Sequence, residues 1–278
     1  MPEFSKGQKA IGHYMLEHYD KAAYLTASKL GAVVRVSEST VVRFANELGF
    51  EGYPELQKSL QELIRTKLTS VQRMEITNDR IGDGEVLTKI LADDIDKIRN
   101  TLDRIDPAAF DAAVDAIIGA RHIYISGMRS ASLLSGFLGY YFNLMFPDVR
   151  IVQATSSSEM FEQLFRIESG DVFIGISFPR YSKRTLKAID YAKSRGATVI
   201  GITDSPSSPL AGAADLCLTA CSDMASFVDS LVAPLSVINA LLVAISMRKQ
   251  DEIVETLNHL EQIWDEYDVY EKFDTEGK

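Results

Sequence analysis

The spacing of hydrophobic positions changes along this chain. Near the N-terminus, apolar and aromatic positions recur at i, i+3, i+4 and i+7, the spacing of one helix face. These positions are Ile11, Tyr14, Met15 and His18. They predict an amphipathic helix over residues 5–20. Beyond residue 120, short apolar runs alternate with helical segments instead, so the two parts of the chain differ in fold class.

A pair of short helices is predicted between residues 26 and 49. Thr26 is a suitable N-cap for a helix that ends near Val34. Ser37 is a second N-cap candidate, and its helix runs to Leu48 and stops at Gly49. Two helices joined by a tight turn over so few residues have the outline of a helix-turn-helix.

The second of these helices has two different faces. Val41, Phe44, Ala45 and Leu48 share one face and are predicted to pack inward. Hydrogen-bonding side chains lie on the opposite face and around the helix start, where they suit base edges and phosphates in a major groove. The candidates are Lys29, Arg35, Ser37, Ser39, Thr40, Arg43 and Asn46. Periodicity alone favours an ordinary amphipathic surface helix.

The sequence of this region resembles the N-terminal domain of RpiR/MurR-type bacterial transcriptional regulators. The most specific part is Val36-Ser-x-x-Thr-Val-Val-Arg-Phe-Ala-x-x-Leu-Gly-Phe-x-Gly-Tyr. The resemblance implies a DNA-binding domain. One position departs from it, because Arg35 stands where the turn usually carries glycine. If that turn needs a left-handed backbone, a non-glycine residue costs about 1 kcal/mol.

A linker is predicted after this domain. Periodicity fades from Thr66 to Gly84, and we assign residues 1–75 to the helical domain and 76–84 to the linker. Residues 85–278 form the second domain. It begins with a helix over 85–105 and another over 106–118, where Asp106 is the N-cap and Pro107 fits the first turn.

The second domain then alternates strands and helices five times, which predicts a parallel sheet with helices on both faces. The strands are predicted at 122–126, 150–153, 171–176, 198–202 and 216–219. The helices are predicted at 131–145, 157–167, 182–194, 226–247 and 250–270, with a helical turn near Leu210. The fold class is therefore α plus α/β, an all-helical domain followed by a five-stranded parallel α/β sandwich.

Charge and cysteine content limit which partners and which kinds of site the chain can have. The net charge of −10 argues against nucleic acid, but residues 1–75 sum to +1 and the remainder to −11. A local basic face on the first domain is therefore allowed. The two cysteines, Cys217 and Cys221, make neither a disulfide framework nor a zinc site, and the N-terminus has no apolar leader. We expect a cytoplasmic protein with no membrane segment, no metal and no cofactor.

Three loops lie where ligands bind to open parallel sheets, beyond the carboxyl ends of the strands. Each precedes a helix N-terminus, which offers free N–H groups to an anion. They carry hydroxyls and arginines suited to phosphate, although each Ser or Thr is also a plausible helix cap. The candidates are Arg129, Ser130, Ser132, Ser156, Ser157, Ser177, Arg180, Ser182 and Thr185.

Residues 105–250 look like a sugar isomerase (SIS) domain, the domain attached to the helix-turn-helix in RpiR-type regulators. The resemblance rests on Gly127-Met-Arg-Ser, the loop over 176–185, and Ala188-x-x-Tyr-Ala-Lys-x-x-Gly-Ala-Thr-Val-Ile-Gly-Ile-Thr-Asp. It implies a phosphosugar effector, with Ser130, Ser177, Ser182 and Thr185 as the best-matching positions. Arg129 replaces a usual glycine and the 176–185 loop is longer and more basic than usual, which leaves open a bulkier or more acidic ligand, or none.

These observations predict a transcriptional regulator that binds double-stranded DNA, senses a small phosphorylated or anionic metabolite and forms a homodimer or homotetramer. The alternative is a sugar-phosphate isomerase with an accessory helical domain. Isomerisation needs a general base, and Glu159, the only carboxylate in the three loops, is better explained as a helix-capping residue. A third hypothesis is a sensor domain that serves only for dimerisation.

Overall fold

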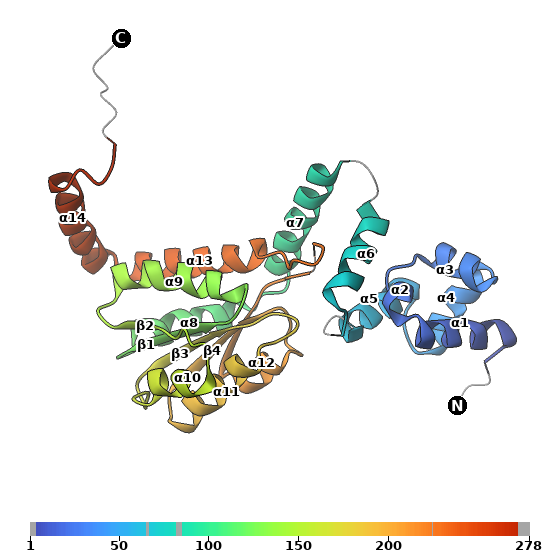
Figure 1. Cartoon of the computed structure of the whole chain (residues 1–278), viewed down its shortest axis with the longest axis horizontal. Coiled ribbons are helices and arrows are strands. Elements are labelled where there is room, and N and C mark those ends of the chain that lie inside the picture. The colour runs from blue at the N-terminus through green and yellow to red at the C-terminus, as the bar shows by residue number, and fades with distance from the viewer. Residues whose placement is uncertain (1–3, 65–66, 82–84, 224, 272–278) are drawn as a thin grey trace, which may run out of the picture. The chain divides into compact units, whose positions relative to one another are not determined.

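The computed structural model describes residues 4–64, 67–81, 85–223 and 225–271 (Figure 1). The chain divides into two compact units. The first unit comprises Met1–Asp93 together with Asp223–Ser230, and the second comprises Asp94–Ser222 and Leu231–Lys278. The short segment Asp223–Ser230 therefore belongs with the N-terminal region, which no pattern in the sequence predicts.

The first unit is helical. Its helices are α1 (Lys6–Glu17), α2 (Tyr19–Ala22), α3 (Ala27–Val34), α4 (Glu38–Glu47), α5 (Tyr53–Ile64) and α6 (Ser70–Ile81). Ser5 and Gln8 form a capping box at the start of α1. The predicted caps are confirmed, because Thr26 accepts from the Lys29 amide and Ser37 accepts from the Thr40 amide.

The core of this unit forms between α1, α3, α4 and α5. Val41, Phe44 and Ala45 are buried in it, as predicted. Leu48 is 43% exposed, so its predicted inward position is wrong. The reason is that α4 ends at Glu47 and the backbone reverses at Gly49, where φ is +92°. Phe50, beyond the reversal, packs against the core instead.

Residues predicted to lie in the linker are helical. Helix α6 covers residues 70–81, while 82–84 lie outside the described residues. Its apolar spacing is weak because few of its side chains reach a core. Ile76 packs with Ile64, Leu68 and Ala23, and Gln72 Nε2 donates to Asp20 Oδ2 over 3.1 Å. Helix α6 is therefore attached to the helices that precede it.

The second unit contains a five-stranded parallel sheet in the order β2-β1-β3-β4-β5. This confirms the predicted architecture, and the register pairs Gly127 with Ile176 at the carboxyl edge. The strands are β1 (Ile123–Gly127), β2 (Val149–Ile151), β3 (Val172–Ile176), β4 (Thr198–Thr203) and β5 (Leu216–Thr219).

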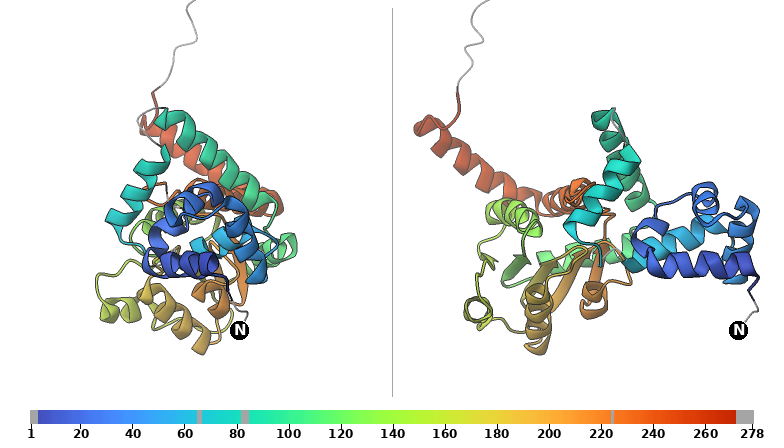
Figure 2. Two further views of the ribbon diagram at one scale, coloured as in Figure 1. Left: turned by 90° about the vertical axis from the view of Figure 1, so that its right-hand side faces the viewer. Right: turned by 45° about the vertical axis from the view of Figure 1, so that its right-hand side comes forward.

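Helices cover both faces of the sheet (Figures 1 and 2). On one face α8 (Pro107–Ile118), α9 (Ala131–Met145) and α13 (Val232–Arg248) pack on side chains such as Ile125 and Ile174. On the other, α10 (Ser157–Leu164), α11 (Lys183–Ser194) and α12 (Pro209–Ala213) pack on Tyr124 and Phe173. Neighbouring residues of one strand thus face opposite layers.

Two helices flank this core. Helix α7 (Val86–Leu102) leads into the second unit, and α14 (Gln250–Glu266) packs on α9 and α13. Helix α13 begins at Val232, later than the predicted 226. Residues 225–230 are not helical; they form a turn that belongs to the first unit. Within the described residues no single helix is long and apolar enough to cross a membrane; α13 and α14, bent by 101°, pass that test only as a pair.

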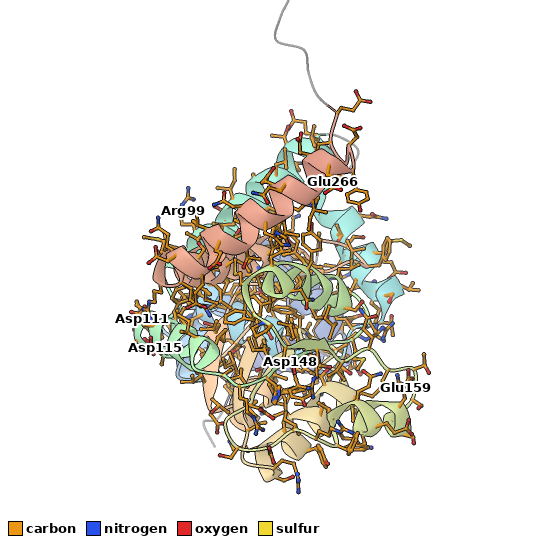
Figure 3. All side chains as sticks on the ribbon, turned by 90° about the vertical axis from the view of Figure 1, so that its left-hand side faces the viewer. Arg99, Asp111, Asp115, Asp148, Glu159 and Glu266 are labelled. Carbon is orange, nitrogen blue, oxygen red and sulfur yellow. The ribbon has the colours of Figure 1, made fainter. Side chains whose placement is uncertain are left out.

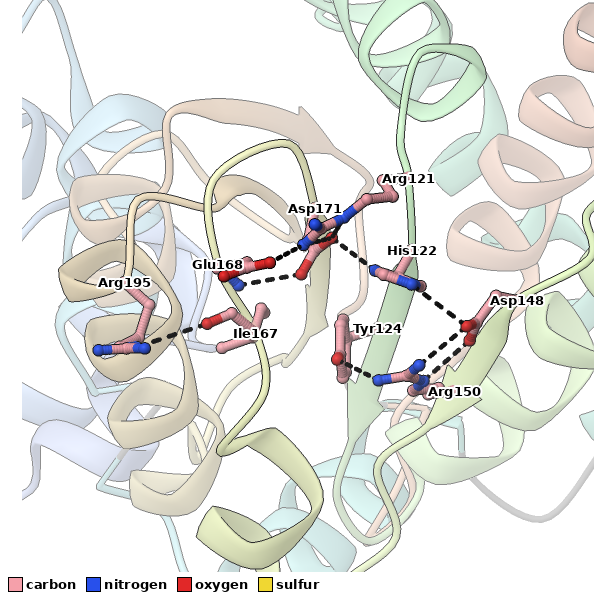
Figure 4. Close-up of polar contacts among 9 residues, drawn as sticks. All are labelled: Arg121, His122, Tyr124, Asp148, Arg150, Ile167, Glu168, Asp171 and Arg195. Carbon is pink, nitrogen blue, oxygen red and sulfur yellow. Dashed lines mark hydrogen bonds and ion pairs between the residues drawn. The ribbon is translucent and has the colours of Figure 1, made fainter.

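A network of charged side chains ties the amino edge of the sheet together (Figure 4). Asp171, which has no exposed side-chain surface, accepts from Arg121 Nε at 3.1 Å and lies 2.8 Å from His122 Nδ1. The Glu168 amide also donates to it, at 2.9 Å. Burial by itself would raise the pKa of Asp171, but the bonds from Arg121, the Glu168 amide and His122 outweigh burial and lower that pKa.

We expect Asp171→Asn to lower the free energy of unfolding at neutral pH by about 3 kcal/mol, because it leaves Arg121 and His122 beside an uncharged group. A carboxyl group with a lowered folded pKa contributes its full stability above its unfolded pKa of about 3.9 and loses it as the pH falls through the folded pKa. Urea unfolding at pH 7 and at pH 3 should therefore show a larger difference between wild type and variant at pH 7. An equal difference at both pH values would contradict this role.

Candidate functional site

The turn between α3 and α4 is tight. Arg35 has φ of +61° and ψ of 45°, so the turn does need a left-handed residue, as the sequence suggested. The Val36 amide donates to Gly31 O over 2.8 Å. A Cβ at Gly31 would lie 2.8 Å from Val36 O, so this glycine allows the close approach of the two segments. The turn fixes how α4 is presented.

The predicted DNA-contacting residues lie around the start and outer face of α4. Ser37 Oγ is 2.9 Å from Ser39 Oγ and 2.8 Å from Thr40 Oγ1, so these hydroxyls form one small cluster at the helix N-terminus. Arg43 Nε donates to Ser39 O over 3.3 Å, which holds its side chain along the helix. Lys29, Arg35 and Asn46 are exposed as well. The surface is polar and cationic, and these side chains are exposed among the described residues of this unit.

A second polar region forms at the carboxyl edge of the sheet. The β1–α9 and β3–α11 loops are neighbours because β1 and β3 are paired. The β2–α10 loop is attached to them by Arg184, whose Nη1 donates to Ala154 O over 3.1 Å. A Cβ at Gly127 would lie 2.4 Å from Ala131 O, so the chain turns sharply from β1 into α9. The structure therefore brings the three predicted loops to one edge.

Several predicted hydroxyls have local partners. Ser156 and Ser182 are N-caps that accept from the Glu159 and Thr185 amides. Ser132 Oγ donates to Arg129 O over 2.6 Å, and Ser177 Oγ accepts from the Ser182 amide. The capping interpretation therefore fits Ser156 and Ser182, whereas the bonds of Ser132 and Ser177 shape the loops without capping a helix. Ser130 makes no side-chain cap bond at the start of α9, and Ser157 is half-buried in the first turn of α10.

Two buried hydroxyls at this edge lack a hydrogen-bond partner among the described residues. They are Ser126 Oγ and Thr185 Oγ1, and both residues are fully buried. Ser126 follows Tyr124 on the face of β1 that α11 covers, and Thr185 lies in the first turn of α11. Buried polar groups are nearly always hydrogen-bonded. These two hydroxyls are therefore the unsatisfied polar groups at this edge of the sheet among the described residues.

Both predicted arginines have an unusual backbone. Arg129 has φ of +59° and Arg180 has φ of +54°. Only Gly visits this region without cost, and a left-handed residue of another type costs about 1–2 kcal/mol. Such strain tends to gather at functional sites. Two exposed arginines thus stand on adjacent loops beside two helix N-termini.

A fourth loop contributes residues that sequence reasoning missed. Tyr181 Oη donates to Asp204 Oδ1 over 2.9 Å, which links the β3–α11 loop to the end of β4. Ser126 was also missed, although a serine that ends an otherwise apolar strand is a signal that could have found it.

The thiol of Cys217 lies near Asp204. Burial and, to a smaller extent, the charge of Asp204 raise the pKa of Cys217 to about 11, so this thiol stays protonated.

Glu159 has a structural role. Its Oε2 accepts from Thr155 N at 2.7 Å and from Thr155 Oγ1 at 2.9 Å. These bonds lower the pKa of Glu159. The residue lies on α10 at the surface (Figure 3), and it stabilises the start of that helix, as predicted. Within the described chain no three His, Cys, Asp or Glu side chains gather in a way that could hold a metal ion.

Comparison with known families assigns both units. The family model of the helix-turn-helix domain of the rpiR family matches residues 1–67. The model of the SIS domain matches residues 116–244. The sugar isomerase domain of an RpiR transcription factor from Sphaerobacter thermophilus superposes with a TM-score of 0.60 at 29% identity, covering 63% of this chain and 97% of that one.

Curated relatives that align with most of this chain are named HTH-type transcriptional regulators. The HTH-type transcriptional regulator HexR of Pseudomonas aeruginosa is 27% identical over 257 residues, which is 90% of this chain and 87% of HexR. The NanR protein of Vibrio vulnificus, solved in complex with ManNAc-6P, has the same fold, with a TM-score of 0.59 at 20% identity over 95% of this chain and 96% of that one. This chain belongs to the RpiR-type family of helix-turn-helix transcriptional regulators with a SIS domain.

We expect Arg43→Ala to weaken binding to the specific operator by about 1–3 kcal/mol, because Arg43 lies on the exposed face of α4 and is the candidate for contact with a base edge. The operator is obtained by selection from a random duplex pool with the wild-type protein. Affinity is then measured by fluorescence anisotropy on that duplex and on a scrambled one. Unchanged specific affinity in a folded variant would show that α4 is not the recognition helix.

Arg35→Gly is the matched comparison for Arg43→Ala. Arg35 is a phosphate-contacting candidate, so its loss should weaken binding to both duplexes alike and reduce the salt dependence. The thermal stability should not fall, since glycine adopts φ of +61° without strain. Lys29→Ala should show the same uniform loss. A base-specific effect of either variant would reverse the assignment of roles.

Proposed function

We propose that this protein is a transcriptional regulator whose operator affinity is controlled by a phosphorylated sugar or a related anionic metabolite, bound at the carboxyl edge of the SIS-domain sheet. The observation that carries the effector is the pair of buried hydroxyls, Ser126 and Thr185, which have no hydrogen-bond partner among the described residues. An oxygen-rich ligand at this edge would supply the missing partners.

The charge around this site favours an anion. Arg129 and Arg180 stand on adjacent loops with a strained backbone, and α9 and α11 begin beside them. Helix N-termini and guanidinium groups both stabilise a dianion such as a phosphate. Asp204 and Tyr181 at the same edge offer groups that hydrogen-bond to hydroxyls, which fits a ligand with a polyol part.

The proposal assigns no catalytic step to this site. Isomerisation of a sugar phosphate requires a base near the substrate carbons, and two carboxylates there already have partners: Glu159 accepts from Thr155, and Asp204 accepts from Tyr181. The isomerase alternative predicts turnover of a sugar phosphate by the purified protein in the absence of DNA.

A regulator of transcription acts on the chromosome, so we also propose that the protein works in the cytoplasm.

We expect Arg180→Ala to weaken effector binding by about 2–4 kcal/mol, because a charge-assisted contact is lost. A panel of sugar phosphates is first screened by thermal shift, since a ligand at 100 times its Kd adds about 2.7 kcal/mol of apparent stability. Calorimetry with the best binder then compares wild type and variant. Operator affinity without effector should stay within the error of the wild-type value.

Arg166→Ala is the control for Arg180→Ala. Arg166 is also an exposed arginine of the second unit, but it follows α10 and lies away from the carboxyl edge. Its loss should leave effector affinity unchanged. Equal affinity of the wild type and Arg180→Ala would mean that the basic β3–α11 loop is not the anion site, and catalytic turnover would favour the isomerase.

We further propose that the chain forms a homodimer through α7. Most apolar side chains of α13 pack on the chain's own sheet. Helix α7 instead exposes a row of apolar side chains spaced by four, four, three and four residues. They are Leu87, Leu91, Ile95, Ile98 and Leu102, and each is at least 39% exposed. Such a seam is typical of helices that pair with another helix.

Light scattering should therefore give twice the mass of one chain at micromolar concentration. Ile95→Asp should weaken the dimer more than tenfold, because burying a large aliphatic side chain contributes about 1.5–3 kcal/mol. Asn100→Asp, on the opposite side of α7, adds the same charge and should leave the dimer intact. A wild-type monomer, or equal effects of the two variants, would rule out this interface.

A further inference from the structure

The connection between β5 and α13, residues 220–231, has an unusual course. It leaves the sheet at the carboxyl edge, where the Ala220 amide donates to Thr203 O over 2.8 Å. It returns at Leu231, which packs on the core of the second unit. Between these points, Asp223–Ser230 belong to the first unit. We call the described residues of this connection, 220–223 and 225–231, the return segment.

The return segment is fastened to the first unit by a buried ion pair. Asp229 Oδ1 lies 2.7 Å from Arg73 Nη1 on α6, and the side chains are 17% and 3% exposed. The segment closes on itself through the Ser230 amide, which donates to Asp223 O. A buried charge left without its partner is strongly unfavourable. A movement that separates Asp229 from Arg73 therefore raises the free energy of the protein.

Helix α6 carries this contact to the DNA-binding helices. Arg73 lies one turn from Thr77, whose hydroxyl donates to Arg73 O, and Ile76 packs with Ile64 of α5 and Ala23 after α2. Gln72 adds the bond to Asp20 described above. Because these contacts join α6 to α2 and α5, a displacement of Asp229 is passed on to the helices that support α4.

The other end of the return segment is fastened to the second unit. The Cys221 amide donates to Thr101 Oγ1 of α7 over 2.9 Å, and Thr101 in turn donates to Lys97 O. The segment is therefore attached to α6 near one end and to α7 near the other. These are the two helices that connect the helix-turn-helix with the sheet along the chain.

We infer that the return segment couples the effector site to the DNA-binding domain, and that the Arg73–Asp229 ion pair is the contact that transmits the coupling. The inference rests on the proposed function, since it needs both a DNA site and an effector site. Arg73 and Asp229 are positioning residues that touch neither ligand. Coupling is reciprocal, so DNA binding must alter the affinity for the effector if the effector alters DNA affinity, and we expect that change to be visible in the effector loops.

The test uses DNA as the probe, so no effector needs to be known. Hydrogen exchange of the full-length chain is followed by mass spectrometry with and without a duplex that the wild type selects from a random pool. In the wild type, DNA should slow exchange in α4 and should also change exchange in residues 220–231 and in the loops 128–132 and 177–182. In Asp229→Asn, α4 should remain protected while the change in the two loops is lost.

Conservative and reversed variants separate the ion pair from simple folding. Asp229→Glu keeps the charge and should keep the change in the loops, and so should Arg73→Asp combined with Asp229→Arg. Asp111→Asn is the control variant. Asp111 on α8 (Figure 3) forms another ion pair, with its Oδ1 3.0 Å from Arg248 Nη2, and its replacement should leave the change in the loops as in the wild type. Loss of the change in Asp229→Glu and in the reversed pair alike would assign it to packing and overturn the role of the ion pair.

Two results overturn the coupling itself. One is that hydrogen exchange in the two loops does not change in the wild type although DNA protects α4. The other is that DNA changes exchange in the loops of Asp229→Asn as much as in the wild type. If no duplex protects α4, the DNA-binding function fails first and the coupling falls with it. That failure is recognised at α4, whereas failure of the coupling is recognised only at the loops.

Discussion

The burial of both faces of the parallel sheet is the constraint on which the other features depend. Every strand of β2-β1-β3-β4-β5 runs in the same direction, so each connection must cross a face of the sheet as a helix. All loops that follow a strand then gather at one edge, and all loops that precede a strand gather at the other. The sheet thus has two distinct edges, one formed by the loops that follow strands and one by the loops that precede them.

The two edges use their charges differently. At the amino edge, Asp171 is bonded to Arg121, His122 and the Glu168 amide, so the charges satisfy one another and fix the starts of β1 and β3. At the carboxyl edge, the buried hydroxyls of Ser126 and Thr185 have no hydrogen-bond partner among the described residues, and Arg129 and Arg180 have a strained backbone. Backbone strain of this kind persists only where the surrounding structure holds it.

Much of this fold could be predicted from local signals. The caps Thr26, Ser37 and Asp106 marked helix starts because a side-chain oxygen before a helix has one evident partner, and the buried strands were marked by short apolar runs. Helix α6 was missed because its core contacts, Ile76 among them, are few, and Leu48 was misplaced because the chain reverses one residue later. The orphan hydroxyl of Ser126 depends on packing between β1 and α11, which no spacing in the sequence encodes.

The assignment of residues 223–230 to the first unit could not have been predicted for a similar reason. An ion pair between residues 73 and 229 joins positions far apart in the chain, and neither residue stands out in its own neighbourhood. Its consequence is nevertheless physical. A rigid sheet cannot transmit a small change at its edge by bending, so the change must appear in the connections that leave that edge. Among the described connections, the one after β5 also belongs to the unit that carries α4, and the inferred coupling therefore needs only this connection and the Arg73–Asp229 ion pair to reach that unit.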